Sequence, residues 1–395
     1  MESKKKLLFV IPSLDAGGAE KSLVNLLNTI DPELYDVDLF LFSRRGLFLK
    51  QVPMFVRILE HDENFATFQK PLFRSIINFV TKRNFSLAIN RFRFANLQRF
   101  GGNRTISEQQ SWKLKRKALS ELTGNYDAAV AYLEKSSVYF IVDKVKSTKR
   151  IAFIHTYYSK LLADKKFDDA YFNEVNSIVT VSEECATDLK HNFPYYSSKI
   201  HLIQNIVNAE LIRKLAEENS ESLGPNALVS VGRLVTLKGF DIAIEAAKIL
   251  KEKKENFHWY IIGEGEERKY LQSLINKYEL QEFFHLLGLK ENPYPYLKKA
   301  SIFVQPSRYE GKSISVDEAK ILSKPIILTN FATAKDQILH SYNGIICDMS
   351  ANSLADSIQI YWKDYEFRNT VISNLQSENF GTENEIVKFY KLIDD

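Results

Sequence analysis

Two carboxylates, Glu310 and Glu318, supply the stretch 301–320 with groups that could hold a ligand or act on a bond. If both acids lay on one helix, their spacing of eight residues would separate them by roughly 12 Å. The paired carboxylates of glycoside hydrolases lie about 5 Å or about 6.5–9.5 Å apart. We therefore expect the two acids to hold opposite ends of one long ligand. Two solvated acids near the start of a helix are the alternative.

A strand, a loop and a helix must position these acids. The apolar run 302–305 fits a buried parallel strand, and Pro306 and Gly311 are typical of a loop. Residues 313–322 then have helical spacing. The backbone N–H groups at the start of a helix have no partner within it and favour a phosphate. The pattern thus predicts an acidic loop beside an anion-binding helix start.

A basic loop follows the predicted strand 227–231. Arg233 and Lys238 lie five residues apart within a segment that begins at Gly232 and ends at Gly239. Two cations in a glycine-bounded loop can clamp a diphosphate. Ordinary surface charge is the alternative, but the position at the carboxyl end of a strand favours a ligand.

Two further features follow predicted strands of the first half. Gly17 and Gly18 separate the strand 7–11 from a helix over 22–30, and a glycine pair there lets the backbone approach a ligand closely. A plain tight turn explains the pair equally well. His155 ends the strand 150–154, where an open parallel sheet places ligand-binding residues. A histidine satisfied within the core is the alternative.

Several motifs resemble sites but do not fit them. Residues 262–268 resemble a dinucleotide fingerprint whose third glycine is replaced by Arg268. Residues 311–313 resemble the end of an NTPase phosphate loop that lacks the glycine where Pro306 stands. These two matches are therefore weak.

The acid pair Asp36 and Asp38 resembles a metal-binding motif of some sugar transferases. Alternation along the predicted strand 37–42 explains the pair better, with both acids on a solvated face. We therefore expect no metal site.

The bulk composition is that of a globular protein. Its 395 residues favour two domains, 45% are hydrophobic, 26% are charged, and a net charge of +4 points to no nucleic acid. Cys185 and Cys347 lie far apart without metal-ligand spacing, which fits free thiols in a reducing compartment. The first apolar run is short and Pro12 interrupts it, so we interpret it as a strand and not as a signal peptide. No run reaches the roughly 18 apolar residues of a membrane span. We expect a cytoplasmic protein.

The order of the elements predicts two α/β domains. A polar stretch over 209–226 separates two series of alternating strands and helices. This pattern predicts two doubly wound parallel sheets of the Rossmann-like class, 1–208 and 209–379, with a ligand in the cleft between them. The predicted strands are 7–11, 37–42, 127–133, 150–154, 177–181 and 199–203, then 227–231, 258–262, 283–287, 302–305, 325–329 and 344–347.

The segment 70–118 differs from the rest of the chain because basic and aromatic residues alternate in it. Glu108 is its one acid. Such a mixture on helices suits an anionic membrane surface. A nucleic-acid surface would look similar, but no recognised motif accompanies it. A solvated basic helix pair with packed aromatics is the other alternative. The aromatic residues are Phe73, Phe79, Phe85, Phe92, Phe94, Phe100 and Trp112.

Taken together, these motifs resemble glycosyltransferase family 4, the retaining enzymes of GT-B fold. The resemblance spans nearly the whole chain and is strongest over 229–348. The run 293–296 and the segment 333–337 look like bacterial enzymes that build capsule, exopolysaccharide or related surface glycans. The matching pieces are Gly17-Gly18-Ala19-Glu20, Val231-Gly232-Arg233-Leu234 with Lys238-Gly239, Ile262-Gly263-Glu264-Gly265, Gly288 through Leu297, Tyr309-Glu310-Gly311 with Glu318-Ala319, and Lys324-Pro325.

The resemblance implies a role for each matching side chain. Arg233 and Lys238 would neutralise the donor diphosphate and the leaving group. Glu318 would bind the ribose hydroxyls, and Glu310 would contact the donor sugar near its 3-hydroxyl. His155 would lie beside the 6-position of that sugar.

Backbone groups complete the implied donor site. The N–H groups of Gly17 and Gly18 would approach the phosphate, and the loop from Leu287 and Gly288 to Lys290 would hold the base. The last helix, about 380–395, would return to the first domain. Departure of a nucleoside diphosphate could be stabilised by two cations and a helix start without a metal or other cofactor.

The sequence departs from the family pattern at two places in the expected donor site. Gly311 is followed by Lys312 and Ser313, where the family has an apolar or small pair. Lys312 therefore adds a phosphate contact or alters the donor pocket. His155 is followed by Thr156-Tyr157 in place of an acidic or amide neighbour.

The resemblance implies a metal-independent, retaining hexosyltransferase. It would move a sugar from a nucleotide sugar, with a UDP-sugar favoured, to a membrane-linked or polymeric glycan, as a peripheral protein on the inner face of the cell membrane. A catalytically silent partner of another transferase and a GT-B sugar-nucleotide epimerase are the alternatives.

Overall fold

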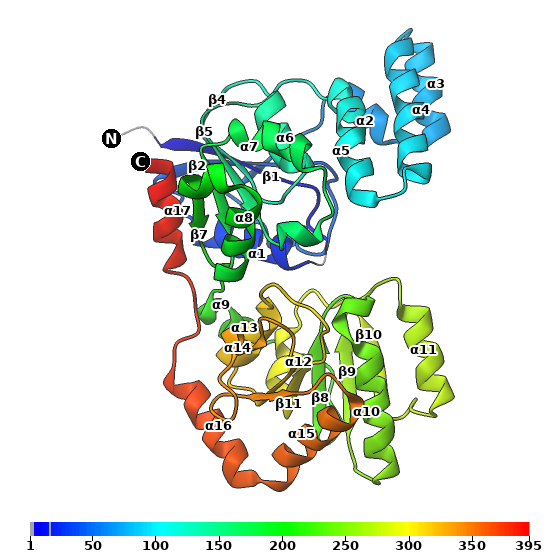
Figure 1. Ribbon diagram of the computed structural model, residues 1–395, viewed down its shortest axis with the longest axis vertical. Coiled ribbons are helices and arrows are strands. Elements are labelled where there is room, and N and C mark those ends of the chain that lie inside the picture. The colour runs from blue at the N-terminus through cyan, green and yellow to red at the C-terminus, as the bar shows by residue number, and fades with distance from the viewer. Residues whose placement is uncertain (1–3, 16, 395) are drawn as a thin grey trace. The chain divides into compact units, whose positions relative to one another are not determined.

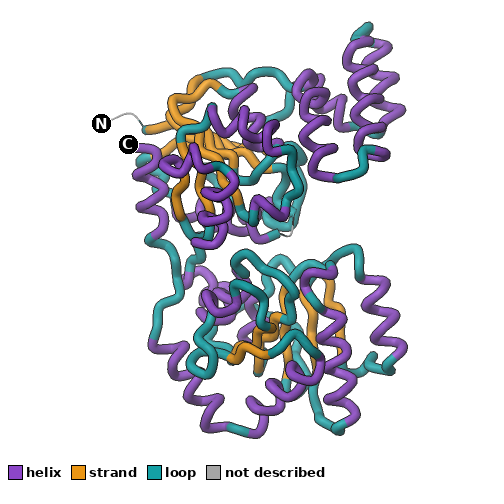
Figure 2. Tube along the Cα trace, viewed as in Figure 1, coloured by secondary structure: helices purple, strands orange, loops and turns teal. Residues whose placement is uncertain are grey.

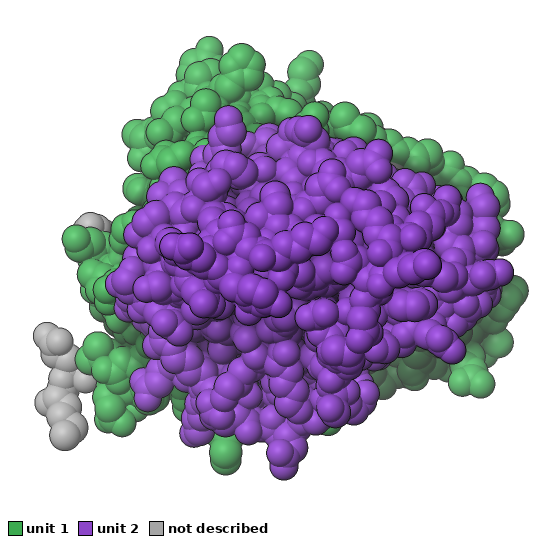
Figure 3. All heavy atoms as spheres, turned by 90° about the horizontal axis from the view of Figure 1, so that it is seen from below, with its two compact units in different colours: residues 1–15, 19–205, 384–395 green, residues 16–18, 206–383 purple. Residues whose placement is uncertain are grey.

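The chain folds into two compact units. In the computed structural model, which describes residues 4–15 and 17–394, unit 1 comprises Met1–Asp15, Ala19–Asn205 and Asn384–Asp395, and unit 2 comprises Ala16–Gly18 and Ile206–Glu383 (Figure 3). The division after Asn205 lies three residues before the boundary expected from the sequence. Each unit contains one parallel sheet, so the predicted pair of Rossmann-like folds is confirmed.

Unit 1 is built on a seven-stranded parallel sheet with the strand order β3-β2-β1-β4-β5-β6-β7. Continuous apolar runs form its central strands because helices cover a parallel sheet on both faces. Five of the six strands expected in this half are present to within two residues at either end, β5 begins four residues before the expected 150, and β3 is an addition. The strands are β1 (Lys5–Ile11), β2 (Tyr35–Leu41), β3 (Arg57–Ile58), β4 (Asn125–Ala131), β5 (Lys146–Ile154), β6 (Ser177–Thr180) and β7 (Ile200–Leu202).

Short polar side chains start several helices of unit 1. Asp62, Asn84 and Ser182 each accept a backbone N–H of the first turn of a helix, as N-caps do. The helices are α1 (Gly18–Thr29), α2 (Glu63–Gln69), α3 (Leu72–Thr81), α4 (Phe85–Phe100), α5 (Arg104–Lys115), α6 (Ser136–Lys144), α7 (Lys165–Asn173), α8 (Glu183–Asn192) and α17 (Glu385–Asp394). Among the described residues, no helix is both long enough and apolar enough to cross a membrane.

The end of the chain returns to unit 1. The ring of Phe389 on α17 lies 5.8 Å from that of Phe9 on β1, and Tyr390 stacks on Tyr35 of β2 at 5.0 Å. Phe389 is fully buried. Helix α17 therefore packs against strands β1 and β2 of unit 1.

Asp38 corrects one expectation from the sequence. The alternation of β2 was expected to leave both Asp36 and Asp38 on a solvated face, but Asp38 is 4% exposed. It accepts hydrogen bonds from the guanidinium of Arg57, at 2.8 and 2.7 Å, and from the hydroxyl of Tyr126 at 2.7 Å. A partner from β3 and another from β4 thus make this buried carboxylate a structural link across the sheet.

Unit 2 is built on a six-stranded parallel sheet with the order β10-β9-β8-β11-β12-β13. One apolar cluster packs α10 and α15 against one face, and another packs α9, α12 and α13 against the other (Figure 2). The strands are β8 (Ala227–Val231), β9 (His258–Ile262), β10 (Phe284–Gly288), β11 (Ile302–Gln305), β12 (Ile326–Thr329) and β13 (Ile345–Cys347). The helices are α9 (Ala209–Leu215), α10 (Phe240–Glu252), α11 (Arg268–Lys277), α12 (Tyr294–Lys299), α13 (Ile314–Ile321), α14 (Ala334–Gln337), α15 (Ala351–Lys363) and α16 (Tyr365–Ser377).

Each sheet has one point where the direction of strand addition reverses. In unit 1 the chain adds β2 and β3 on one side of β1 and then continues with β4 on the other side. In unit 2 it adds β9 and β10 beside β8 and then places β11 on the opposite side of β8 (Figure 1). Ligands of open α/β sheets bind outside the carboxyl ends of the strands at such a switch point. The topology therefore directs attention to the loops after β1, β4, β8 and β11.

Candidate functional site

The two motifs expected to bind a donor both lie at the switch point of unit 2. The basic loop follows β8 and the acidic loop follows β11, which are neighbouring parallel strands. Gly239, with φ 65°, lets the loops meet, because a Cβ on this residue would lie 1.9 Å from the carbonyl oxygen of Pro306. The topology thus brings together two segments that are about 70 residues apart in the sequence.

An ion pair between Lys238 and Glu310 forms the centre of this site. Lys238 Nζ donates to Glu310 Oε1 at 2.5 Å. The same oxygen accepts hydrogen bonds from Gln305 Nε2 at 2.7 Å and Ser307 Oγ at 2.6 Å. Glu310 is 8% exposed. Three donors on one oxygen hold this carboxylate in one orientation, which suits a group that must receive a ligand hydroxyl.

Helix α14 supports the acidic loop from the other side. Thr333 Oγ1 donates to the backbone oxygen of Glu310 at 3.0 Å, and Gln337 Oε1 accepts the backbone N–H of Ser313 at 2.9 Å. No side-chain cap is made by Ser313, the N-cap residue of α13. The sequence assigned no role to Gln305, Thr333 or Gln337. Gln305 ends the buried strand β11, and Thr333 and Gln337 follow the buried strand β12, and these positions were the signal available for finding them.

A second ion pair holds the basic loop in place. Arg308 donates to both carboxylate oxygens of Asp241, at 2.7 and 2.6 Å, and its guanidinium also bonds the backbone oxygen of Thr236 at 2.9 Å. The backbone N–H of Arg308 donates to the backbone oxygen of Leu237 at 2.8 Å. A bidentate pair fixes orientation as well as distance. Arg308 therefore positions the loop that carries Lys238.

The dinucleotide-like motif, residues 262–268, packs against the basic loop that begins at Gly232. A Cβ on Gly263, where φ is 155°, would lie 1.9 Å from the backbone oxygen of Gly232. The backbone N–H of Leu234 donates to the backbone oxygen of Glu264 at 3.0 Å. The motif thus packs against the basic loop, which is a structural use of these glycines.

The other two cations expected at this site, Arg233 and Lys312, differ in whether the protein already supplies an ion-pair partner. Arg233 is exposed, and its guanidinium has no hydrogen bond or ion pair with the described residues. Lys312 lies 3.7 Å from Asp317, a buried carboxylate that also pairs with Lys320 at 2.7 Å. Arg233 is therefore ready for an anion, whereas Lys312 already has an internal partner.

Glu318 lies on α13, with its side chain almost fully buried. Its Oε1 accepts the hydroxyl of Tyr294 at 3.2 Å. Burial, reinforced by the charge of Glu318, raises the pKa of Tyr294 well above its usual value, so this phenol stays a donor. The structure therefore gives the second acid a neutral hydrogen-bond partner.

The structure also places the backbone groups expected around the donor. Leu287 and Gly288 end β10, and Gly288 has φ 74°, a conformation that favours glycine. Gly311 lies in the acidic loop beside Glu310. Gly17 precedes α1, and Gly18 is the first residue of that helix, which begins four residues earlier than expected. Gly18 therefore belongs to a helix start and not to the preceding loop.

In unit 1, His155 directly follows β5 and is partly buried. Its Nε2 is buried without a hydrogen-bond partner among the described residues. Burial lowers the pKa of the imidazole to about 4, so the ring is neutral at physiological pH. The backbone N–H of His155 donates to Glu134 Oε2 at 3.4 Å. Sequence reasoning missed Glu134, which follows the neighbouring strand β4.

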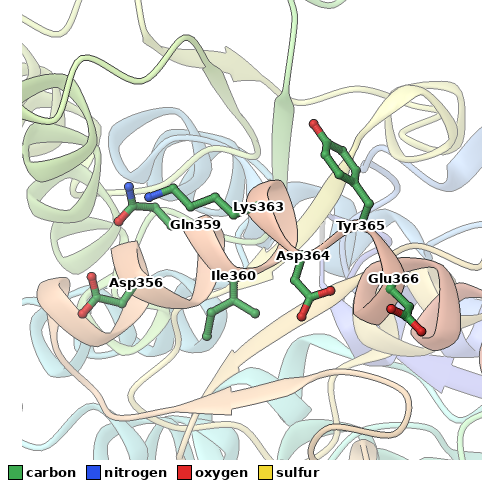
Figure 4. A pocket seen from close by; sticks show the side chains of 7 residues that line it. All are labelled: Asp356, Gln359, Ile360, Lys363, Asp364, Tyr365 and Glu366. Atoms are coloured by element: carbon green, nitrogen blue, oxygen red, sulfur yellow. The ribbon is translucent and has the colours of Figure 1, made fainter.

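A hollow of about 620 Å³ on unit 2 lies where α15 meets α16. Figure 4 shows its side chains spread along these helices. Asp364 caps α16 through the N–H of Phe367, and Asp356 pairs with Lys253 at 3.0 Å. These groups support helix ends, so the hollow is not part of the candidate site. The lining residues are Asp356, Gln359, Ile360, Lys363, Asp364, Tyr365 and Glu366.

Comparisons with known proteins concern mainly the segment that carries the two loops. Residues 212–378, which include both loops, match the family described as glycosyl transferases group 1. An uncharacterized glycosyltransferase of Methanocaldococcus jannaschii is 32% identical over 190 residues, 46% of each chain. A Campylobacter jejuni N-acetylgalactosamine-N,N'-diacetylbacillosaminyl-diphospho-undecaprenol 4-alpha-N-acetylgalactosaminyltransferase is 24% identical over 246 residues, 62% of this chain and 66% of the relative. The chain thus spans about half the length of the first of these relatives.

Solved structures show the same fold over the whole chain. The structure of Anabaena HepE in complex with UDP and glucose has a TM-score of 0.70 at 16% identity, covering 99% of this chain and 100% of that one. The likeness confirms the predicted GT-B class of two Rossmann-like domains. Residues 212–378 are thus similar to the glycosyl transferases group 1, and the likeness in fold extends over both units.

Proposed function

We propose that this protein is a retaining glycosyltransferase that moves a sugar from a UDP-sugar to a membrane-linked or polymeric glycan acceptor. The observation that carries the proposal is the Lys238–Glu310 pair at the switch point of unit 2, within the segment that matches the family. A nucleotide sugar combines an anionic diphosphate with neutral hydroxyls. A cation beside a fixed carboxylate offers one partner for each kind of group.

The chemistry requires stabilisation of a departing diphosphate. The bond from the anomeric carbon to the phosphate oxygen breaks, a bond to the acceptor oxygen forms on the same face, and the acceptor proton passes to the leaving phosphate. Lys238 and the exposed Arg233 neutralise the charge that develops, with the uncapped start of α13 as a third source of positive potential. These groups supply the stabilisation without a metal ion.

The remaining residues hold the donor. Glu310 accepts a hydroxyl of the transferred sugar, Glu318 accepts the ribose hydroxyls, and His155 receives the 6-hydroxyl. Leu287 and Gly288 hold the base through backbone groups. UDP is favoured as the nucleotide because HepE, whose fold matches this chain, was solved with UDP and glucose.

The basic and aromatic segment 70–118 supports an acceptor at a membrane surface. Phe73, Ile77 and Val80 form an exposed stripe on α3, and Phe85, Ile89 and Phe92 form one on α4, in both cases at spacings of four and three residues. Figure 1 shows these two helices standing away from the sheet of unit 1.

Exposed lysines and arginines accompany both stripes, so we propose that α3 and α4 dock on anionic lipid. Phe79 and Trp112, in contrast, are buried and serve the core. The Campylobacter jejuni relative, whose name specifies a diphospho-undecaprenol substrate, is consistent with a lipid-linked acceptor.

Donor turnover by the wild-type protein and by Arg233→Ala and Glu318→Ala tests the assignment. We expect both variants to bind UDP more weakly in calorimetry and to lose most of their turnover. Unchanged rates in both would remove the site. Absence of UDP binding by the wild type would favour a silent partner subunit. Epimerised donor, detected by nuclear magnetic resonance without acceptor, would favour an epimerase.

Vesicle flotation tests the docking surface. The protein should float with phosphatidylglycerol vesicles and not with phosphatidylcholine vesicles, and Phe73→Ser with Ile77→Ser should reduce the bound fraction. Leu34→Ser, an exposed apolar residue elsewhere in unit 1, is the matched control. Equal flotation with both lipids would contradict docking on anionic lipid.

A further inference from the structure

A second polar centre lies at the switch point of unit 1. Glu134 and Lys135 follow β4, which borders the switch point, and His155 follows β5, the next strand of the sheet. The backbone N–H of His155 and the carboxylate of Glu134 connect the two turns. In an open parallel sheet this corner is the place where a ligand binds. Unit 1 therefore has a candidate ligand site at its own switch point.

The carboxylate of Glu134 is poorly satisfied by the protein itself. It is partly buried, and its hydrogen bonds are a long one of 3.4 Å from the His155 N–H and one within its own residue. Among the described residues no lysine, arginine or histidine forms an ion pair with it. The neighbouring Lys135 pairs with Glu108 at 3.4 Å. Burial raises the pKa of Glu134. Such a carboxylate costs stability unless a ligand completes its hydrogen bonds.

The backbone beside this carboxylate is strained. Lys135 has φ 66° and ψ −120°, a region that residues other than glycine rarely occupy. Two contacts to Glu108, from Lys135 Nζ and from Ser136 Oγ at 3.0 Å, hold the turn in this conformation. Strain that is enforced by surrounding contacts is concentrated at functional sites. The turn is therefore held so that Glu134 is presented at the edge of the sheet.

The imidazole of His155 adds a second acceptor atom. The ring donates to the backbone carbonyl of Tyr132, and its Nε2 has no hydrogen-bond partner in the part of the chain that the structure describes. In a neutral imidazole that donates through one nitrogen, the other nitrogen is an acceptor. Glu134 thus presents a carboxylate with only weak donors, and His155 presents a ring nitrogen without a donor among the described residues. A phosphate would be repelled by the carboxylate, whereas the hydroxyl groups of a neutral sugar supply the missing donors.

We propose that Glu134 is a positioning residue for the sugar that receives the transferred group, and that it accepts hydrogen bonds from hydroxyl groups of that acceptor. The inference rests on the proposed glycosyl transfer, which requires a second sugar site beside the donor. Because His155 Nε2 is proposed to receive a hydroxyl of the donor sugar, the carboxylate of Glu134 is left for a hydroxyl of the acceptor sugar.

Glu134→Gln tests the proposal because it keeps the size of the side chain and replaces an acceptor oxygen by a donor. We expect the KM for acceptor to rise about tenfold or more, by the loss of one charge-assisted hydrogen bond. UDP affinity in calorimetry and slow hydrolysis of the donor by water should stay unchanged. The thermal midpoint should stay equal or rise, because a partly buried charge is removed. Glu33→Gln, an exposed acid of unit 1, is the matched control.

Binding of simple sugars gives a readout that is independent of turnover. Saturation-transfer nuclear magnetic resonance with the methyl glycosides of glucose, galactose and N-acetylglucosamine should show contact in the wild type and its loss in Glu134→Gln. An unchanged acceptor KM with unchanged glycoside contact would overturn the inference. So would a lowered thermal midpoint together with weaker UDP binding, which would mark a structural role. Failure of the wild type to bind UDP would instead count against the proposed function.

Discussion

A single carboxylate oxygen of Glu310 accepts hydrogen bonds from Lys238, Gln305 and Ser307, and the side chain is almost fully buried. Such a group is fixed in place before any ligand arrives, which avoids the cost of orienting it during the reaction. Arg233 represents the opposite case, since it is exposed and unpaired among the described residues. The site thus combines one preorganised pair with one cation that is available for a ligand.

The first prediction concerns the charge at position 310. Glu310→Gln keeps the shape of the side chain but removes the anion that faces Lys238, so we expect the rate of sugar transfer to fall about 10²-fold. Initial rates at saturating donor measure the change. Glu266→Gln, an exposed acid after β9, is the control and should transfer at the wild-type rate. Equal rates for both variants would exclude a role of the 310 carboxylate in transfer.

The second prediction concerns the pH dependence of stability. Folded His155 has a pKa of about 4, whereas an unfolded histidine takes up its proton near pH 6.5. Between these values the unfolded chain binds more protons, so the free energy of unfolding falls as the pH falls through this window. We expect His155→Phe to reduce that loss, which amounts to at most about 3 kcal/mol for a partly buried ring.

Denaturant titrations at pH 7 and pH 4.5 measure this effect. Exposed His191→Phe is the control, and it should keep the pH dependence of the wild type. The prediction is wrong if the His155 variant loses as much stability on acidification as the wild type does.

At the scale of elements, the loops after β8 and β11 depend on contacts that no local pattern indicates. Arg308 anchors one loop to Asp241, and Gly239 allows the other to approach Pro306. Helix α14 then holds the acidic loop through Thr333. Rigid elements thus place loop residues with the precision that a binding site needs.

The third prediction concerns the close approach at Gly239. A Cβ there would lie 1.9 Å from the Pro306 oxygen, so Gly239→Ala must move one loop. We expect UDP affinity to fall at least about tenfold and stability to fall by about 1–3 kcal/mol. Gly102→Ala provides the control, because its φ of 70° is similar while its Cβ would meet open space. If both variants bind UDP alike, the loop contact has no effect on the site.

At the scale of the molecule, each unit has its own sheet, its own core and its own switch point. The chain passes from unit 1 to unit 2 after Asn205 and returns after Glu383. The last segment is therefore part of the first unit, and α17 contributes buried side chains to it.

The fourth prediction uses this return of the chain. Phe389 is fully buried against Phe9, so Phe389→Ala should destabilise unit 1 by about 3–5 kcal/mol. Trp112 reports on unit 1 and Trp259 on unit 2, so fluorescence of single-tryptophan backgrounds separates the units. Val387→Ala, at an exposed site of the same helix, is the control. A loss confined to the Trp259 signal would contradict the assignment of α17 to unit 1.

The sequence by itself determined the fold class, because apolar runs and helical periodicity are local properties of a chain. The expected strands of both halves are found within two residues at either end, except that β5 begins four residues early at Lys146, and the stretch 302–322 folds as the expected strand, loop and helix. The motifs with Arg233, Lys238 and Glu310 lie at the carboxyl ends of strands, where the topology places ligands. Their roles remain predictions.

Only the tertiary structure decided how these residues pair. The burial of Asp38 depends on Arg57 and Tyr126, and the link of Glu310 to Lys238 joins loops far apart in the sequence. Glu134 carried no local signal, because its neighbour His155 reaches it only through the pairing of β4 and β5. Hydrogen bonds between distant segments follow from strand order and loop packing, which no short stretch of sequence encodes.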